Sequence, residues 1–400
     1  MSLHQSAENS LNFEYFMTQA QELTPLVSAE ADEAERLHHM TDKVAHAFQE
    51  AGLYRMLLPR ELGGAELSMS EAMQVVETIA RADGSTGWCL MVGNIELGTG
   101  GAYLPDRGVE RVFAQGPDIV IAGQGIPRGV ARSVEGGYQI QGDWSYASGI
   151  YHAAFIHTGC VLMQDDKPVI NDAGVPEVLI CHVPREEIEL KENWDVIGLR
   201  GTGSFDYSIS NLFVPEEMTH SMGISEPQRG GNQYTIGLTG FTAWGHTTFA
   251  LGVGRHALDE IATLARSKGN VFGRISDGAS FQERYARAEA MYRSVRAFCY
   301  SAWDDLSETL ASGGRASLEQ IALVRLAMRY LHEVVSDVCT FAHKAGGGVS
   351  LRGGALQRCY RDIHAATQHI LLSDQIMQDC GKVLMGAAEE NAKWTILGLR

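Results

Sequence analysis

The sequence predicts an α+β fold in which a helical region comes first, a β domain follows, and helices return up to the end of the chain. Apolar residues recur at three- and four-residue steps in roughly the first hundred residues. Short stretches rich in β-branched and aromatic residues replace them between about residues 117 and 215, and the helical period then resumes. This order differs from the alternating strands and helices of a doubly wound nucleotide-binding fold. We therefore expect three domains, at residues 1–116, 117–220 and 221–400.

The N-terminal domain is predicted to be helical because its apolar side chains fall on one helix face. Within residues 28–52, Leu37, Met40, Val44 and Phe48 are three or four positions apart, and the pattern stops at the LLPRELGG turn. A second helix is expected in the stretch MSEAMQVVETIARADG that follows.

The middle domain is predicted to be an antiparallel sheet, and the last domain to be helical. Residues 137–148 (GYQIQGDWSYAS) and 204–214 (SFDYSISNLFV) have strand composition, and turn signals such as EGG separate the strands. Residues 317–320 have the sequence of a capping box and open a helix with an apolar face from Ile321 to Val335. This stripe and the one at 370–385 are longer than one bundle needs, so we expect subunit contacts there.

Composition and charge exclude several functional classes. The 400 residues carry 32 Lys and Arg against 49 Asp and Glu, a net charge of −17, which would repel a nucleic-acid backbone. No apolar run reaches the roughly 18 residues of a membrane span, and no signal-peptide pattern is seen. We expect a cytoplasmic protein that binds neither nucleic acid nor membrane. The seven scattered cysteines, with no CxxC pair, are expected to be small core residues.

Motif searches point away from nucleotide and metal chemistry. The Walker pattern GxxxxGK[ST] does not occur in the sequence, and the nearest dinucleotide fingerprint, at 252–257, follows a helical stretch where that motif needs a strand. His364 and His369 are five positions apart, whereas a chelating pair on a helix is four apart. We therefore expect no nicotinamide domain and no metal site.

Two segments of the β domain have compositions that suit a ligand site. Residues 142–149 (GDWSYASG) are typical of a strand that ends in a turn. Residues 194–204 (WDVIGLRGTGS) place three glycines around an arginine and two hydroxyls. Such a loop lets the backbone approach a ligand closely, and an ordinary loop is an equally good interpretation.

The order and spacing of four segments resemble the acyl-CoA dehydrogenase fold superfamily. The segments are ADGSTGW at 82–88, the two described above, and RDIHAATQH at 361–369, spread over about 300 residues. The resemblance implies an N-terminal helical domain, a middle β domain and a C-terminal four-helix bundle. It also implies a flavin bound between sheet and bundle, and a homotetramer.

At the catalytic positions, this chain resembles the members of the family that are flavin-dependent monooxygenases. In most dehydrogenases of the family a glutamate follows the RD pair by eight positions, and here that position is Ile370. The other known placement of this base falls in 245–254, which contains neither Asp nor Glu. Instead, His369 precedes the vacant position, and YASG stands where dehydrogenases usually have Thr-Asn. Members of this branch receive reduced flavin from a separate reductase, in agreement with the lack of a nicotinamide domain.

The resemblance implies roles for several residues. Ser148 would lie beside flavin N5, with the strand that contains Trp144, Tyr146, Ala147 and Gly149 against the isoalloxazine. His369 would deprotonate a phenolic substrate or stabilise the oxygenated flavin, which survives only where water is excluded. The alternative for His369 is a packed or capping histidine.

Further residues are implied at the edges of the site. Arg266 and Phe272 would reach the flavin phosphate or adenine from a neighbouring subunit, unless they belong to a plain exposed loop. Trp88, Asn94 and Arg200 are the expected substrate contacts.

Many oxygenases of the family have a histidine where this chain has Asn94 and Glu96, which leaves room for oxygenation at nitrogen or sulfur. Arg361 and Asp362 are expected to form a structural ion pair.

We therefore predict a monooxygenase that uses reduced FMN or FAD from a separate reductase, with O2, to hydroxylate a hydrophobic, aromatic small molecule. An acyl-CoA dehydrogenase-like oxidoreductase and a catalytically silent flavin- or ligand-binding homologue are the alternatives.

Overall fold

The computed structural model describes residues 11–171, 174–271 and 273–400. The N-terminal helices are α1 (Phe13–Leu37), α2 (Asp42–Glu50), α3 (Met69–Ala82), α4 (Gly84–Tyr103) and α5 (Asp106–Val112). The helical prediction for this region is confirmed, but the stretch 28–52 is not one continuous helix. His38 adopts a left-handed backbone with a φ of 63° and ends α1. The predicted second helix is α3, whose capping box joins Ser68 and Glu71.

The middle region is one sheet with the strand order β6-β7-β2-β1-β3-β5-β8, in which β4 pairs with β3. Its strands are β1 (Ile121–Val134), β2 (Gly137–Ala147), β3 (Phe155–Gln164), β4 (Lys167–Pro168), β5 (Val178–Pro184), β6 (Glu189–Leu190), β7 (Phe205–Pro215) and β8 (Thr219–Ser221). The β domain is confirmed, but the sheet is mixed where an antiparallel one was expected. β3 pairs with β1 and not with β2, and since the chain reverses after each strand, β1 and β3 run parallel.

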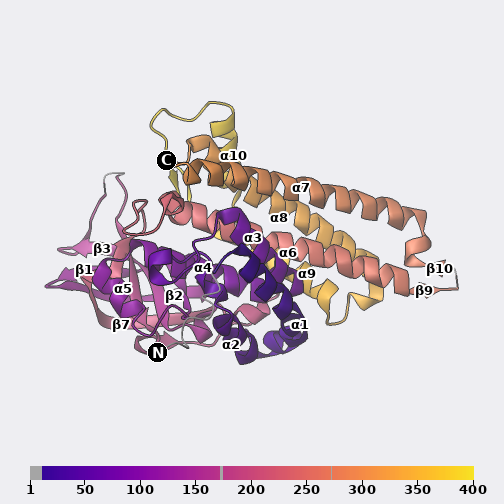
Figure 1. Ribbon diagram of the computed structural model, residues 1–400, viewed down its shortest axis with the longest axis horizontal. Helices are drawn as coiled ribbons and strands as arrows, with labels where there is room; N and C mark the ends of the chain where they lie inside the picture. Colours follow the sequence, from indigo (N-terminus) through magenta and orange to yellow (C-terminus); the bar gives the residue numbers. More distant parts are fainter. Residues whose placement is uncertain (1–10, 172–173, 272) are drawn as a thin grey trace, which may run out of the picture.

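The C-terminal region is a helical bundle, as expected (Figure 1). Its helices are α6 (Gly237–Ser267), α7 (Ala279–Ala311), α8 (Leu318–Gly346), α9 (Ala355–Ala366) and α10 (Asp374–Leu384). α8 packs against α6, α7, α9 and α10. α9 and α10 are two short helices that both pack against α8, and together they take the place of one longer fourth helix. Two small hairpins complete it, β9 (Gly269–Asn270) with β10 (Gly273–Arg274) and β11 (Trp394–Thr395) with β12 (Gly398–Leu399).

The structure of the bundle tests three interpretations of the sequence: the capping box, the apolar stripe and the apparent dinucleotide fingerprint. The capping box at Ser317 and Gln320 is confirmed. The stripe from Ile321 to Val335 is buried within the chain, so this stripe does not require a partner subunit. Gly252, part of the apparent dinucleotide fingerprint, lies in α6, where an added Cβ would lie 2.4 Å from the Cβ of Ala80 on α3. This glycine permits a close helix crossing and is not part of a phosphate loop.

Helix α4 lies between the sheet and α6 and thus connects the three regions (Figure 1). Almost all of its residues are buried. All seven cysteines are buried and free, which confirms their expected place in the core. No helix in the described part of the chain is long and apolar enough to cross a membrane.

Candidate active site

The site is built around the first turns of α4. Asp83 caps this helix by accepting a 2.9 Å hydrogen bond from the backbone N–H of Thr86. One turn further, Trp88 is 6% exposed, and its indole Nε1 donates a 2.9 Å hydrogen bond to Ser148 Oγ. The resemblance had assigned these two residues to substrate and flavin, respectively, and the structure brings them into direct contact.

Ser148 lies in a constrained turn after β2. Tyr146 has a φ of 70°, which is a strained value for a residue other than glycine, and Gly149 has a φ of 77°. The backbone N–H of Gly149 donates a 2.8 Å hydrogen bond to the carbonyl of Thr202. This bond joins the turn to the glycine-rich loop at 194–204, so the two segments singled out in the sequence form one structure.

A row of hydroxyl groups connects the turn to this loop. Ser148 Oγ lies 2.6 Å from Ser204 Oγ, and Ser204 Oγ lies 2.6 Å from Thr202 Oγ1. Thr202 Oγ1 donates a 2.8 Å hydrogen bond to the carbonyl of Leu199. All three hydroxyl-bearing residues are buried, at 7% exposure or less.

Aromatic rings form the other side of the site. The ring centroids of His369 and His246 are 4.2 Å apart, and Trp88 lies 5.0 Å from His246 and 6.1 Å from His369. Phe249 lies 5.0 Å from Trp88, and His332 lies 6.3 Å from His246. The interruption between α9 and α10 brings His369 into this group, since the residue stands at the start of a short 3-10 turn.

His369 is also a capping histidine, so the alternative interpretation of this residue holds in part. Its Nδ1 accepts a 3.3 Å hydrogen bond from the backbone N–H of Leu371. In a neutral imidazole the other nitrogen then carries the proton. His369 Nε2 is therefore a hydrogen-bond donor.

The imidazoles of the cluster are uncharged at neutral pH. Burial lowers the pKa of His332 and of His369 to about 4. Burial, followed by the repulsion that protonated His369 and His332 would exert, lowers the pKa of His246 well below its usual value. His246 Nδ1 and His332 Nε2 are buried without a hydrogen-bond partner among the described residues.

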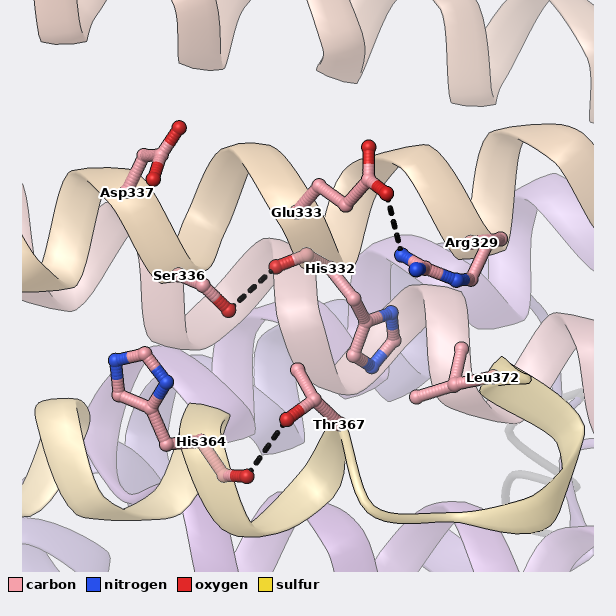
Figure 2. Close-up of a pocket in the computed structure, with 8 residues that line it drawn as sticks. All are labelled: Arg329, His332, Glu333, Ser336, Asp337, His364, Thr367 and Leu372. Atoms are coloured by element: carbon pink, nitrogen blue, oxygen red, sulfur yellow. Dashed lines mark hydrogen bonds and ion pairs between the residues drawn. The ribbon is translucent and has the colours of Figure 1, made fainter. Parts of the chain in front are cut away.

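A pocket of about 450 Å³ lies on the bundle side of the cluster, between α8, α9 and the turn that follows α9 (Figure 2). It is lined by Arg329, His332, Glu333, Ser336, Asp337, His364, Thr367 and Leu372. His332 belongs to both the pocket and the histidine cluster, and its ring points toward Thr367 and Leu372 in Figure 2. The pocket therefore reaches the edge of the cluster.

The other residues predicted from the strand have differing environments. Trp144 is 1% exposed, stacks on Tyr207 and donates to the carbonyl of Gly159, so it belongs to the core of the sheet. Ala147 is buried, whereas the Tyr146 ring is 63% exposed and lies 6.1 Å from the ring of Trp194.

The side chains of two predicted substrate contacts are directed elsewhere. Asn94 Nδ2 donates to the carbonyls of Leu53 and Leu90, both at 3.0 Å. Arg200 donates to the carbonyl of Val196 and lies 2.9 Å from His38 Nε2.

The neighbouring acid on α4 is also enclosed by protein. Glu96 is buried, and burial raises the pKa of its carboxyl well above the usual range, which keeps it neutral.

Two further predicted residues lie far along the chain. Arg266 is in the last turn of α6, next to the β9–β10 hairpin at the tip of the bundle (Figure 1). It donates to Thr263 Oγ1 and lines a groove of about 540 Å³. Within one chain the structure does not bring Arg266 to Ser148. Phe272 lies outside the described residues.

Arg361 and Asp362 have separate partners, so the expected ion pair between them is not formed. Arg361 pairs with Glu35 at 2.6 Å. Asp362 Oδ1 accepts a 2.6 Å hydrogen bond from the backbone N–H of Leu199. Burial, and then the charge of Asp83, raises the pKa of Asp362 to about 7.

Sequence reasoning missed His246 and His332. His246 lies in the segment 245–254, which contains neither Asp nor Glu, and a histidine in that apolar, glycine-rich stretch was the available signal. His332 gave no signal, because it falls within an ordinary amphipathic helix. No group of three or more potential ligands that could hold a metal ion occurs among the described residues.

Family comparison matches both ends of the chain. Residues 18–101 match the domain described as acyl-CoA dehydrogenase, N-terminal domain, and residues 244–374 match acyl-CoA dehydrogenase, C-terminal domain. The sequence is 30% identical over 361 residues to indole-3-acetate monooxygenase of Pseudomonas putida, covering 90% of each chain. It is 27% identical to the oxygenase subunit HsaA of a flavin-dependent monooxygenase from Rhodococcus jostii, covering 87% of this chain and 92% of that one.

A solved structure has the same fold. XiaF from Streptomyces, in complex with FADH2 and glycerol, superposes with a TM-score of 0.83 at 20% identity. The alignment covers 94% of this chain and 96% of that one.

Proposed function

The chain belongs to the acyl-CoA dehydrogenase family, and from this premise we propose that it is the oxygenase component of a two-component, flavin-dependent monooxygenase. A separate reductase would supply reduced FMN or FAD. The substrate would be a hydrophobic, aromatic small molecule, as the names of the relatives suggest.

The uncharged wall of the site is the observation that carries this proposal. Dehydrogenation of an acyl-CoA needs a carboxylate to remove a proton. Ile370 occupies the position of that base and is 51% exposed. The rings that surround Trp88 are the neutral imidazoles of His246 and His369 together with Phe249. Such a wall excludes water and supplies hydrogen bonds, as oxygenation requires, but it offers no carboxylate to take the proton of an acyl-CoA.

The residues present fit a flavin. Ser148 offers a hydroxyl in the turn after β2, and Trp88 offers an aromatic ring. His246 Nδ1 has no hydrogen-bond partner among the described residues and can accept or donate a bond to a ligand. When bound, reduced flavin supplies the activation of O2. Ser148 would bind the flavin at N5, and Trp88 with Phe249 would exclude water.

His369 is proposed to donate a hydrogen bond from Nε2 into the site. Its Nδ1 accepts from Leu371, and its pKa is lowered to about 4. Both facts favour the stabilising role over the role of a general base, because the nitrogen directed away from the cap already holds its proton. Of the two roles that the resemblance implied for His369, this geometry therefore supports the stabilising one and not deprotonation of the substrate.

We also propose a homotetramer in which Arg266 and Phe272 complete the flavin site of a neighbouring subunit. Arg266 follows His246 by twenty residues on α6, which is about 30 Å along the helix, so it cannot serve the site of its own chain. Exposed apolar side chains remain on the bundle, including Leu351, Ile370 and Met385. Light scattering should give about four times the 43.6 kDa chain mass. A stable, active monomer would contradict this assembly.

The function is tested by adding a flavin reductase, NADH, flavin and O2 to the protein with indole-3-acetate as the first substrate. An oxygenase forms a hydroxylated product in proportion to the NADH used. A dehydrogenase instead bleaches an electron-acceptor dye when given an acyl-CoA, and a binding protein does neither. Either of the last two results would refute the proposal.

A further inference from the structure

The row of hydroxyls behind Ser148 has a defined direction. Thr202 Oγ1 donates its only proton to the carbonyl of Leu199, at 2.8 Å. The 2.6 Å contact between Thr202 and Ser204 therefore takes its proton from Ser204. The 2.6 Å contact between Ser204 and Ser148 then takes its proton from Ser148. With the Trp88 N–H as the remaining donor, the protons of the whole row point from α4 toward Leu199.

This direction determines what Ser148 can offer to a ligand. Its proton is directed to Ser204, and one lone pair accepts the indole N–H of Trp88. One lone pair of the Ser148 oxygen is left. Ser148 is therefore an acceptor toward the site and not a donor.

The two redox states of a flavin differ at the atom that meets this serine. In reduced flavin, N5 carries a hydrogen and donates, whereas in oxidised flavin N5 has only a lone pair and accepts. We propose that the row Ser148–Ser204–Thr202 makes the site select reduced flavin over oxidised flavin. The inference rests on the proposed function, since it assumes that Ser148 meets N5. In this role Ser204 and Thr202 are positioning residues, because they act through Ser148.

The size of the preference follows from counting hydrogen bonds. To donate to oxidised flavin, Ser148 must turn its proton away from Ser204, and Ser204 and Thr202 must turn in sequence. The bond from Thr202 to the carbonyl of Leu199 is then lost, although that carbonyl still accepts from Trp194 Nε1 at 2.9 Å. The oxidised complex has one buried hydrogen bond fewer, which corresponds to roughly a 2- to 10-fold difference in affinity.

The far end of the row is held by independent contacts. Leu199 has a left-handed backbone with a φ of 56°, and its N–H donates to Asp362 Oδ1 at 2.6 Å. The carbonyl of Thr202 accepts from Gly149 N–H, which ties the loop to the turn that carries Ser148. These contacts fix the carbonyl on which the direction of the row depends.

Ser204→Ala tests the proposal by removing the acceptor of the Ser148 proton. Dissociation constants of oxidised and of anaerobically reduced FMN and FAD are measured, together with the midpoint potential of the bound flavin. In the variant Ser148 can donate to oxidised N5, so the ratio of oxidised to reduced dissociation constants should fall roughly 2- to 10-fold. The potential should fall by up to about 30 mV, the equivalent of a tenfold change for two electrons.

Three further variants control the test. Ser204→Thr keeps the hydroxyl and should restore the ratio. Thr99→Val removes a buried hydroxyl on α4 that donates to the carbonyl of Ile95 at 2.7 Å, outside the row, and should leave the ratio unchanged. Thr202→Val frees the proton of Ser204 and should lower the ratio in the same direction, which keeps the test valid if Ser204→Ala does not fold.

The outcomes separate the inference from the proposed function. If the unaltered protein binds flavin and both Ser204→Ala and Thr202→Val keep its ratio, the inference is wrong while the proposed function stands. If the unaltered protein binds neither redox state of FMN or FAD, both are wrong.

Discussion

Three buried histidines on one face of the sheet allow a sharp test of the structure. The rings of His157 and His182 are 5.6 Å apart, and those of His182 and His220 are 5.5 Å apart. His182 is 0% exposed, and neither of its ring nitrogens has a hydrogen-bond partner among the described residues. We predict that His182→Leu, which has a similar volume and no polar atoms, stabilises the protein.

The gain in the free energy of unfolding expected for His182→Leu has two parts. An unsatisfied buried polar group costs about 1 to 3 kcal/mol, so the variant should gain about that much at pH 8. Burial, and then the charges of His220 and His157, lowers the pKa of His182 well below its usual 6.5. The unfolded chain therefore binds more protons below pH 6.5, and the stability of the unaltered protein falls as the pH drops. At pH 5, which is 1.5 units below 6.5, this contributes roughly 2 kcal/mol that the variant does not lose.

Urea unfolding at pH 8 and pH 5 measures both parts. His46→Leu is the matched control, because His46 is exposed, and it should change the free energy of unfolding by less than about 0.5 kcal/mol. The difference in free energy of unfolding between His182→Leu and the unaltered protein should increase from pH 8 to pH 5. A destabilised variant, or an advantage that does not depend on pH, would refute the reasoning and would indicate that water satisfies the ring nitrogens.

Three further predictions concern the site. His369→Ala should leave flavin affinity nearly unchanged and lower coupled hydroxylation roughly 10²- to 10⁴-fold, with oxygen released as hydrogen peroxide; full coupling in the variant would contradict the role of this residue. Because the pKa of Asp362 is raised to about 7, its folded form keeps a proton that the unfolded form loses, and stability falls as the pH rises from about 4 to 7. Asp362→Asn keeps the acceptor for the Leu199 N–H but does not titrate. As the pH rises from about 4 to 7, its free energy of unfolding should therefore increase relative to that of the unaltered protein, by up to about 1.4 kcal/mol per pH unit. Parallel plots of the free energy of unfolding against pH for the two proteins would contradict this. Ile370→Glu should not confer acyl-CoA oxidation, and dye reduction by that variant with an acyl-CoA would show that the pocket accepts the thioester.

The order of the helical and β regions could be predicted from the sequence, because apolar residues recur every three to four positions in a helix and every second position in a strand. The two local deviations arose from backbone geometry that periodicity does not encode. The left-handed His38 ends the helix within a continuous apolar stripe. The pairing of β3 with β1 depends on the chain returning beside β1 and not beside β2.

The site was predictable in part. Trp88, Ser148 and His369 are brought together as the resemblance implied. The directions of Asn94 and Arg200 depend on backbone carbonyls and on side chains from distant segments, which no local pattern records. The same holds for His246, which becomes part of the site only because α6 packs against α4.

Isotope incorporation tests the central proposal most directly. The protein is mixed with reduced flavin and indole-3-acetate without oxygen, oxygen-18 gas is then admitted, and the products are analysed by mass spectrometry. The proposed monooxygenase should place one labelled oxygen atom in the product and the other in water. Unchanged substrate, with all of the label recovered as hydrogen peroxide for each aromatic substrate tried, would contradict it.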